Sequence, residues 1–181
     1  MLPSRWLPDP SPVLVTTRLV LEPLTVGHAA EMVQVLSSPA LYAVTGGDPP
    51  SLAELRARYS RQVAGPGSGE RWCNWVLREG SCLVGYVQAT VSAAPRPVAA
   101  VAWLIRPADQ GRGLAVEAAA AMVVHLQPLE VAVVTAWIAD THPASQGVAR
   151  RLGLTPTEQR DEGGERLWSM LLPVDRESAE R

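Results

Sequence analysis

Apolar and polar residues alternate along this chain with the periods of strands and helices in turn. Residues 98–105 and 131–139 are almost wholly apolar, and each run suits a buried strand while being short for a helix. Residues 72–78 and 83–91 carry the period-two alternation of strands, and the turn at Gly80 predicts that they form a hairpin. These segments predict a sheet with buried central strands.

Helical patterns occur on both sides of these strands. Residues 13–21 predict a first strand, and a helix follows with Thr25 as its cap. Ser51 begins a second helix whose apolar residues repeat at helical spacing. The polar residues between them predict a solvent face that carries Arg56, Arg58 and Arg61.

The second half alternates helices with strands. Residues 116–126 are rich in alanine and strongly favour a helix. A helix between two buried strands predicts that the strands are parallel. A helix then ends at Gly153, and residues 154–160 and 165–172 form a last hairpin. The element order predicts an α/β fold.

Composition narrows the class of protein. The 181 residues suit one domain, with an extended arm at residues 1–12, the domain at residues 13–174 and a polar tail at residues 175–181. A net charge of −2 argues against a nucleic-acid partner. No apolar run approaches the ~20 residues of a membrane span. The start lacks an apolar signal core, so we expect a cytoplasmic protein.

A glycine turn joins the strand at residues 98–105 to the alanine-rich helix. Its sequence is Gln110-Gly111-Arg112-Gly113-Leu114-Ala115. A strand, turn and helix in this order leave N–H groups unpaired at the helix start, where they bind anions and commonly diphosphate. The glycines let the anion approach amides that side chains would shield.

Other glycine-loop families fit this turn less well. A P-loop needs Gly-Lys-Ser or Gly-Lys-Thr, and the chain contains no lysine. The dinucleotide fingerprint needs a third glycine where Glu117 stands. An ordinary strand-to-helix turn remains the alternative when the motif is taken alone.

The loop and the element order together resemble the GNAT acetyltransferase superfamily. The loop is similar to the Gln-x-x-Gly-x-Ala motif that binds acetyl-coenzyme A (acetyl-CoA), and residues 140–145 with 150–154 are similar to the family's Asn-x-x-Ser helix ending in Leu-Gly-Phe. Residues 17–24 look like the Rim-type branch, which acetylates ribosomal-protein N-termini. The resemblance implies a mixed central sheet of about seven strands with helices on both faces.

The resemblance also implies a cofactor site where two central parallel strands splay apart. Amides near Leu104, Ile105 and Arg106 would line the pantetheine arm and polarise the thioester carbonyl. The diphosphate would lie on the loop, which here comprises Gln110, Gly111, Arg112, Gly113, Leu114 and Ala115. Arg150 would meet the remaining phosphate charge together with Arg112. For Arg151 a solvated helix face is the favoured interpretation.

Catalytic residues are less clearly marked. Ser145 resembles the proposed proton donor to the departing thiolate, and the alternative is a plain first-turn hydroxyl. His142 replaces the family's usual Asn, and we expect it to contact the cofactor, act as a base or simply begin the helix. The glutamate that many relatives carry before the loop is missing, so Asp140, Asp109 or a water relay would stand in, unless the amine arrives neutral. The favoured interpretation of Asp109 is a solvated loop residue.

Two tryptophans are candidates for the acceptor pocket. Trp103 would lie beside the reacting carbon and Trp72 on the predicted hairpin, although large aromatic residues are more often core residues. His28 and His125 are interpreted as structural.

The predicted function is direct transfer of an acetyl group from acetyl-CoA to a primary amine, without a metal. The acceptor would be a small molecule or a protein N-terminus, and a homodimer through the last hairpin is an open alternative. A competing hypothesis is a module that binds acyl-CoA without catalysis, because the carboxylate is missing. A third is a nucleotide-binding α/β domain.

Overall fold

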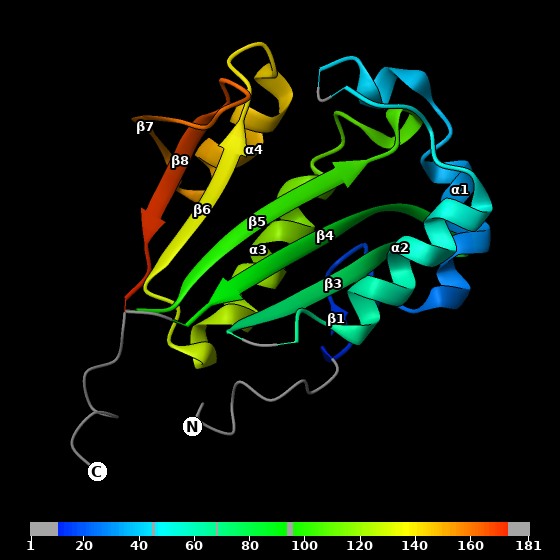
Figure 1. The fold of residues 1–181 in the computed structure, drawn as a ribbon, viewed down its shortest axis with the longest axis horizontal. Coiled ribbons are helices and arrows are strands. Elements are labelled where there is room, and N and C mark those ends of the chain that lie inside the picture. Colours follow the sequence, from blue (N-terminus) through cyan, green and yellow to red (C-terminus); the bar gives the residue numbers. More distant parts are fainter. Residues whose placement is uncertain (1–10, 45, 68, 94–95, 174–181) are drawn as a thin grey trace.

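The computed structural model describes residues 11–44, 46–67, 69–93 and 96–173, and within them one sheet of eight strands in the order β1-β2-β3-β4-β5-β6-β8-β7 (Figure 1). β5 and β6 run parallel, and the other neighbours are antiparallel. The strands are β1 (Leu14–Val15), β2 (Val20–Pro23), β3 (Glu70–Glu79), β4 (Cys82–Ser92), β5 (Val98–Ile105), β6 (Val133–Ile138), β7 (Thr155–Arg160) and β8 (Arg166–Leu171). The tail predicted at residues 175–181 and nearly all of the arm predicted at residues 1–12 lie outside the described residues.

The single first strand predicted at residues 13–21 is wrong. β1 and β2 are separate strands that pair with each other, Leu14 opposite Leu21. Thr16 closes the turn between them, because its backbone amide donates to the Leu19 carbonyl and its hydroxyl accepts from the Leu19 amide. This break gives eight strands in place of about seven.

Helices cover both faces of the sheet, as the resemblance implied. α1 (Ala29–Val35) and α2 (Leu52–Ala64) pack on one face around Met32, Leu55 and Val76. On the other face α3 (Leu114–Leu126) lies behind β4 and β5 in Figure 1, and its apolar residues join the larger core. α4 (Pro143–Leu152) contacts α3 and β6. In the described part of the chain no helix has the length and apolar character needed to cross a bilayer.

Caps fix the starts of the helices on the first face. Ser51 accepts a hydrogen bond from the Glu54 amide, and the Glu54 carboxylate accepts one from the Ser51 amide at 2.8 Å. Such a capping box stabilises a helix start by about 1 kcal/mol. A second box joins Thr25 to His28 at the short 3₁₀ turn (Val26–His28) before α1. The predicted Ser51 cap is confirmed, whereas Thr25 precedes the 3₁₀ turn and His28 is the cap residue of α1 itself.

Arg58 does not lie on the solvent face predicted for α2. Arg56 and Arg61 are exposed, but Arg58 is half-buried. Arg58 follows the buried Leu55 by three residues, and residues three or four apart share a helix face. Its guanidinium is therefore turned toward the sheet.

The parallel strands β5 and β6 diverge, which decides where a site can form. Their pairing begins at Val98–Val133 and ends at Ala100–Thr135. Beyond this point β5 stays paired with β4 as far as Ile105, and β6 stays paired with β8 as far as Ile138. The facing edges of both strands are consequently left without ladder partners.

Candidate active site

The open edge of β5 offers backbone groups to a ligand. The Arg106 amide is not among them, because it donates to the Val84 carbonyl at 2.8 Å. The prediction that the Arg106 amide lines the cofactor arm is therefore wrong. Since amides along a strand face alternate sides, that of Leu104 also faces β4, while those of Trp103 and Ile105 face the open side.

The glycine loop begins where this edge ends. Gly111 and Gly113 have φ values of 76° and 81°, a conformation that costs other residues about 1–2 kcal/mol. Gly113 is the cap residue of α3, and a Cβ on Gly111 would meet nothing within 4 Å. The space above Gly111 is therefore open to a ligand.

Unpaired amides line this opening. Among the described residues, the N–H groups of residues 111–116 find no acceptor, whereas the Glu117 amide donates to the Gly113 carbonyl. These donors stand at the positive end of the helix dipole. They fit a diphosphate, and Leu114 itself is buried beneath them and anchors the turn.

Two side chains hold the ends of the loop in place. The Gln110 side-chain amide donates to the Ile105 carbonyl at 2.9 Å, which ties the loop to the end of β5. The Arg18 guanidinium donates to the Arg112 carbonyl at 2.8 Å and pairs with Glu117 in the first turn of α3. Gln110 was predicted to bind the cofactor, and here it positions the loop.

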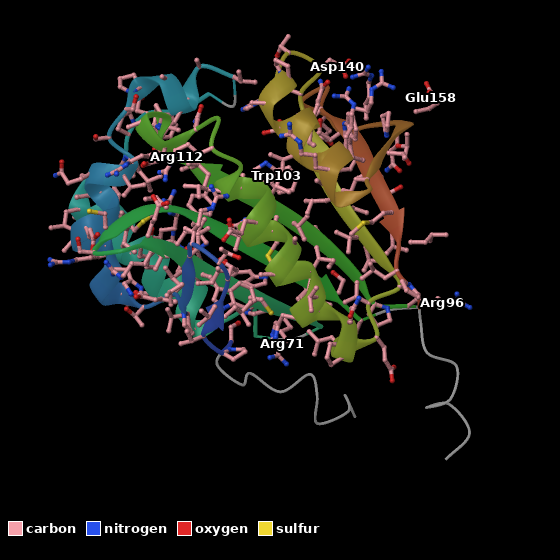
Figure 2. All side chains as sticks on the ribbon, turned by 180° about the vertical axis from the view of Figure 1, so that it is seen from behind. Arg71, Arg96, Trp103, Arg112, Asp140 and Glu158 are labelled. Carbon is pink, nitrogen blue, oxygen red and sulfur yellow. The ribbon has the colours of Figure 1, made fainter. Side chains whose placement is uncertain are left out.

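A chain of ion pairs runs beneath the loop. Asp109 is buried and accepts from Arg106 and from Arg112, so the expectation that it is solvated is wrong. Arg112, which is labelled in Figure 2, also forms two hydrogen bonds to Glu79, at 2.7 and 2.6 Å. The Glu79 hydrogen bonds raise the pKa of the Arg112 guanidinium above its usual value. Because Asp109 and Glu79 already compensate the charge of Arg112, its guanidinium is less available to a phosphate.

The start of α4 brings the two predicted catalytic residues together. His142 is the cap residue, and its Nδ1 accepts from the Ser145 amide at 3.2 Å. Nδ1 is therefore occupied as an acceptor, as an Asn oxygen would be. The Ser145 hydroxyl is half-buried and has no hydrogen-bond partner within the described residues, so it is free to meet a ligand.

Arg150, on the same helix, is exposed. Its guanidinium lies 5.2 Å from the centroid of the Trp168 ring and donates to Gln146. No carboxylate competes for its charge among the described residues. Arg150 is therefore better suited than Arg112 to meet a phosphate.

Neither aspartate suggested as a base is well placed for that role. Asp140 pairs with Arg160 at 2.6 Å and Arg166 at 3.1 Å, and their hydrogen bonds hold its pKa below the usual value. Asp109 is enclosed by two arginines. A carboxylate that is stabilised in its ionised form accepts a proton weakly.

The two candidate tryptophans lie on different faces of the sheet. Trp103 packs against the core that contains α3 (Figure 2). Trp72 pairs in register with Thr90, and its indole donates to Glu70 at 3.0 Å. The structure therefore does not bring Trp103 and Trp72 into one pocket.

A cavity of about 280 Å³ lies between α2 and the strands β3 and β4. Its polar lining comprises Arg58, Tyr59, Gln62, Asn74, Tyr86 and Gln88. Burial raises the pKa of Tyr59 to about 12 and raises that of Tyr86, so both remain neutral phenols. None of these six residues was among the site residues predicted from the sequence. The one available signal was the spacing of Leu55, Arg58, Tyr59 and Gln62, which places them on one face of α2.

The described residues contain no group of three or more His, Cys, Asp or Glu arranged to hold a metal ion. The geometry instead offers amide donors at a helix start, an open strand edge that leads to them and a separate polar cavity. This arrangement suits an extended ligand that carries a diphosphate.

Comparison with solved structures finds the same fold in acetyltransferases. RimL, a ribosomal L7/L12 α-N-protein acetyltransferase in complex with coenzyme A, is 15% identical with a TM-score of 0.74, covering 91% of this chain and 100% of its own. An acetyltransferase from Thermus thermophilus is 23% identical with a TM-score of 0.71, covering 89% and 100%. The microcin C7 self-immunity acetyltransferase MccE, in complex with acetyl-CoA and AMP, is 10% identical with a TM-score of 0.74, covering 87% and 94%.

No curated protein matches the chain in sequence. The similarity in fold to RimL agrees with the Rim-type resemblance of residues 17–24. The acetyltransferase (GNAT) domain family matches residues 18–155, which include the loop, the open edge of β5 and the start of α4. The chain therefore belongs to the GNAT acetyltransferase family, as an acyl-CoA N-acyltransferase.

Proposed function

We propose that this protein transfers an acetyl group from acetyl-CoA directly to a primary amine. The observation that carries the proposal is the set of amides at residues 111–116, unpaired within the described chain and set at the end of a strand that has lost its parallel partner. The amides would bind the diphosphate, and the open edge of β5 would bind the pantetheine arm.

In the proposed reaction the amine nitrogen attacks the thioester carbonyl. The C–N bond forms, the C–S bond breaks and the amine gives up one proton. An amide at the open edge, from Trp103 or Ile105, would stabilise the developing oxyanion. The leaving thiolate would take a proton from Ser145, whose hydroxyl is not engaged by any described residue and would regain a proton from solvent.

The amine must reach the carbonyl without its extra proton. On the face of β5 toward α1 and α2, the residues nearest the open edge are Ala100 and Ala102, so the strand supplies no carboxylate there. We propose that the acceptor binds as the free amine and loses its proton to solvent. The rate should then rise with pH up to the pKa of the acceptor amine.

The absence of a carboxylate on β5 beside the open edge also favours a second function. Without a basic residue near the carbonyl, the domain would bind acyl-CoA and act as a sensor. In that case Ser145 would have no chemical role.

Two measurements decide between these functions. Acetyl-CoA at 100 times its Kd should stabilise the protein by about 2.7 kcal/mol. Release of free thiol should then follow when primary amines are added. Stabilisation without turnover over a broad amine panel would favour the sensor, and no stabilisation would count against both.

A further inference from the structure

Within the described residues, the cavity beneath α2 contains a cation without a counter-ion. Arg58 is half-buried, and no carboxylate of these residues lies within ion-pair distance of it. The half-buried arginines Arg78 and Arg166 each pair with carboxylates. Taking a guanidinium out of water is costly unless an anion compensates it. Arg58 is therefore placed to receive an anion from a ligand.

The rest of the polar lining is neutral. Gln62, Asn74 and Gln88 contribute amide side chains, and Tyr59 is held as a neutral phenol. No aspartate or glutamate is among the described residues that line the cavity. A cavity with one positive charge and no negative charge disfavours polycationic amines such as polyamines or aminoglycosides.

The cavity lies one strand away from β5, at whose open edge the acetyl group would be held. Asn74, Gln88 and Ala102 are paired in register across β3, β4 and β5, so they form one row on the same face of the sheet. Adjacent strands lie about 4.8 Å apart, which places Gln88 one strand from β5. The row ends at Ala102, whose side chain is a single methyl group.

We propose that this cavity binds the acceptor, and that the acceptor is a small amine which also carries a carboxylate, held by Arg58. A guanidinium binds a carboxylate through two parallel hydrogen bonds, and the amide side chains beside it can orient the remainder of the molecule. A volume of about 280 Å³ suits a molecule of amino-acid or dipeptide size. This inference rests on the proposed acetyl transfer and specifies its substrate class.

The test compares matched amines that differ only in their charge. Glycylglycine and γ-aminobutyrate would each be assayed beside the primary amide of the same compound, with spermidine as the polycation. Binding to the coenzyme A-loaded protein would be followed by saturation-transfer NMR, and turnover by kcat/KM. The carboxylates should bind at least tenfold more tightly than their amides, and spermidine should not bind.

Variants of α2 test whether Arg58 causes the preference for carboxylates. Arg58→Gln should abolish the preference for carboxylates and leave the Kd of acetyl-CoA unchanged, while Arg58→Lys should retain part of it. Arg56→Gln removes the same charge from the exposed face of the same helix and should behave like the wild type.

The outcomes separate the two proposals. If the protein does not bind acetyl-CoA, or if it acetylates no amine, the proposed function is refuted. If acetyl-CoA binds but no carboxylate binds better than its amide, or if Arg58→Gln keeps the preference, the proposed anionic acceptor is refuted.

Discussion

Arg18 and Glu117 join the N-terminal strands to the first turn of α3. The guanidinium Nη2 of Arg18 lies 2.6 Å from a carboxylate oxygen of Glu117, and the backbone amide of Arg18 donates to the same carboxylate at 2.8 Å. Because Arg18 also holds the Arg112 carbonyl, this pair fixes the glycine loop from the side of α3. The loop amides are thus arranged for a ligand before one binds.

Removing the Glu117 carboxylate should loosen the loop. Glu117→Ala takes the acceptor from Thr16 and from both the side chain and the amide of Arg18. We expect a loss of about 1–3 kcal/mol in the free energy of unfolding, measured in urea, because donors at a partly buried site lose their acceptor. The Kd of coenzyme A should rise several-fold.

The contribution of Glu117 should depend on pH in the acid range. Burial would raise its pKa, but hydrogen bonds from Thr16 and Arg18 outweigh burial and hold the pKa below the ordinary 4.5. A carboxyl with a lowered folded-state pKa stabilises fully above its unfolded value and less as the pH falls through the folded one. The stability difference between wild type and Glu117→Gln should therefore be constant well above pH 4.5 and shrink below it. A difference that persists unchanged at lower pH would contradict this assignment.

Gly111→Ala should impair binding beyond its effect on the fold. The backbone strain at φ 76° should cost about 1 kcal/mol, and the new methyl group would enter the open space above the amides. The Kd of coenzyme A should rise at least tenfold. The control is Gly164→Ala in the β7–β8 turn, where φ is 82° and the space is equally open. Equal binding by both variants would show that the loop does not contact the ligand.

Ser145→Ala and His142 variants separate chemistry from helix capping. Ser145→Ala should lower kcat by tenfold or more and leave stability unchanged, because its hydroxyl makes no hydrogen bond to the described residues. His142→Ala should lower stability by about 1 kcal/mol, since it removes the cap on α4, and His142→Asn should restore it. An unchanged kcat in Ser145→Ala would exclude it as the proton donor.

Gly85→Ala should disrupt the pairing of β4 with β5. A Cβ at this position would lie 2.0 Å from the Leu104 carbonyl oxygen, a backbone atom that a rotamer change cannot move. We expect a loss of roughly 2 kcal/mol or more in denaturant unfolding. Gly27→Ala is the matched control, because its Cβ would make only an ordinary contact of 3.6 Å with Thr25 and should cost little.

Local chemistry explains what the sequence predicted well. The capping box of Ser51 and Glu54 and the positive-φ glycines of the loop depend on a few adjacent residues, so their spacing alone indicates them. The element order followed from periodicity because the strands and helices are long. The break at Thr16 was missed because both halves of residues 13–21 favour extended structure, and a single side chain makes the turn.

The errors in the site concern contacts between distant residues. Asp109 was expected to be solvated, since nothing in its neighbourhood shows that Glu79 draws Arg112 over it from another strand. Periodicity assigned Arg58 to the solvent face, because a helical pattern shows where apolar residues lie and not which polar residue faces a cavity. The end of pairing between β5 and β6 leaves no mark in either strand, and only the family resemblance implied it.

A crystal structure of the protein with acetyl-CoA tests the central claim most directly. The account predicts diphosphate oxygens within about 2.7–3.2 Å of amide nitrogens of residues 111–116, with the thioester beside the open edge of β5. A diphosphate bound elsewhere, or loop amides turned to acceptors within the chain, would contradict it.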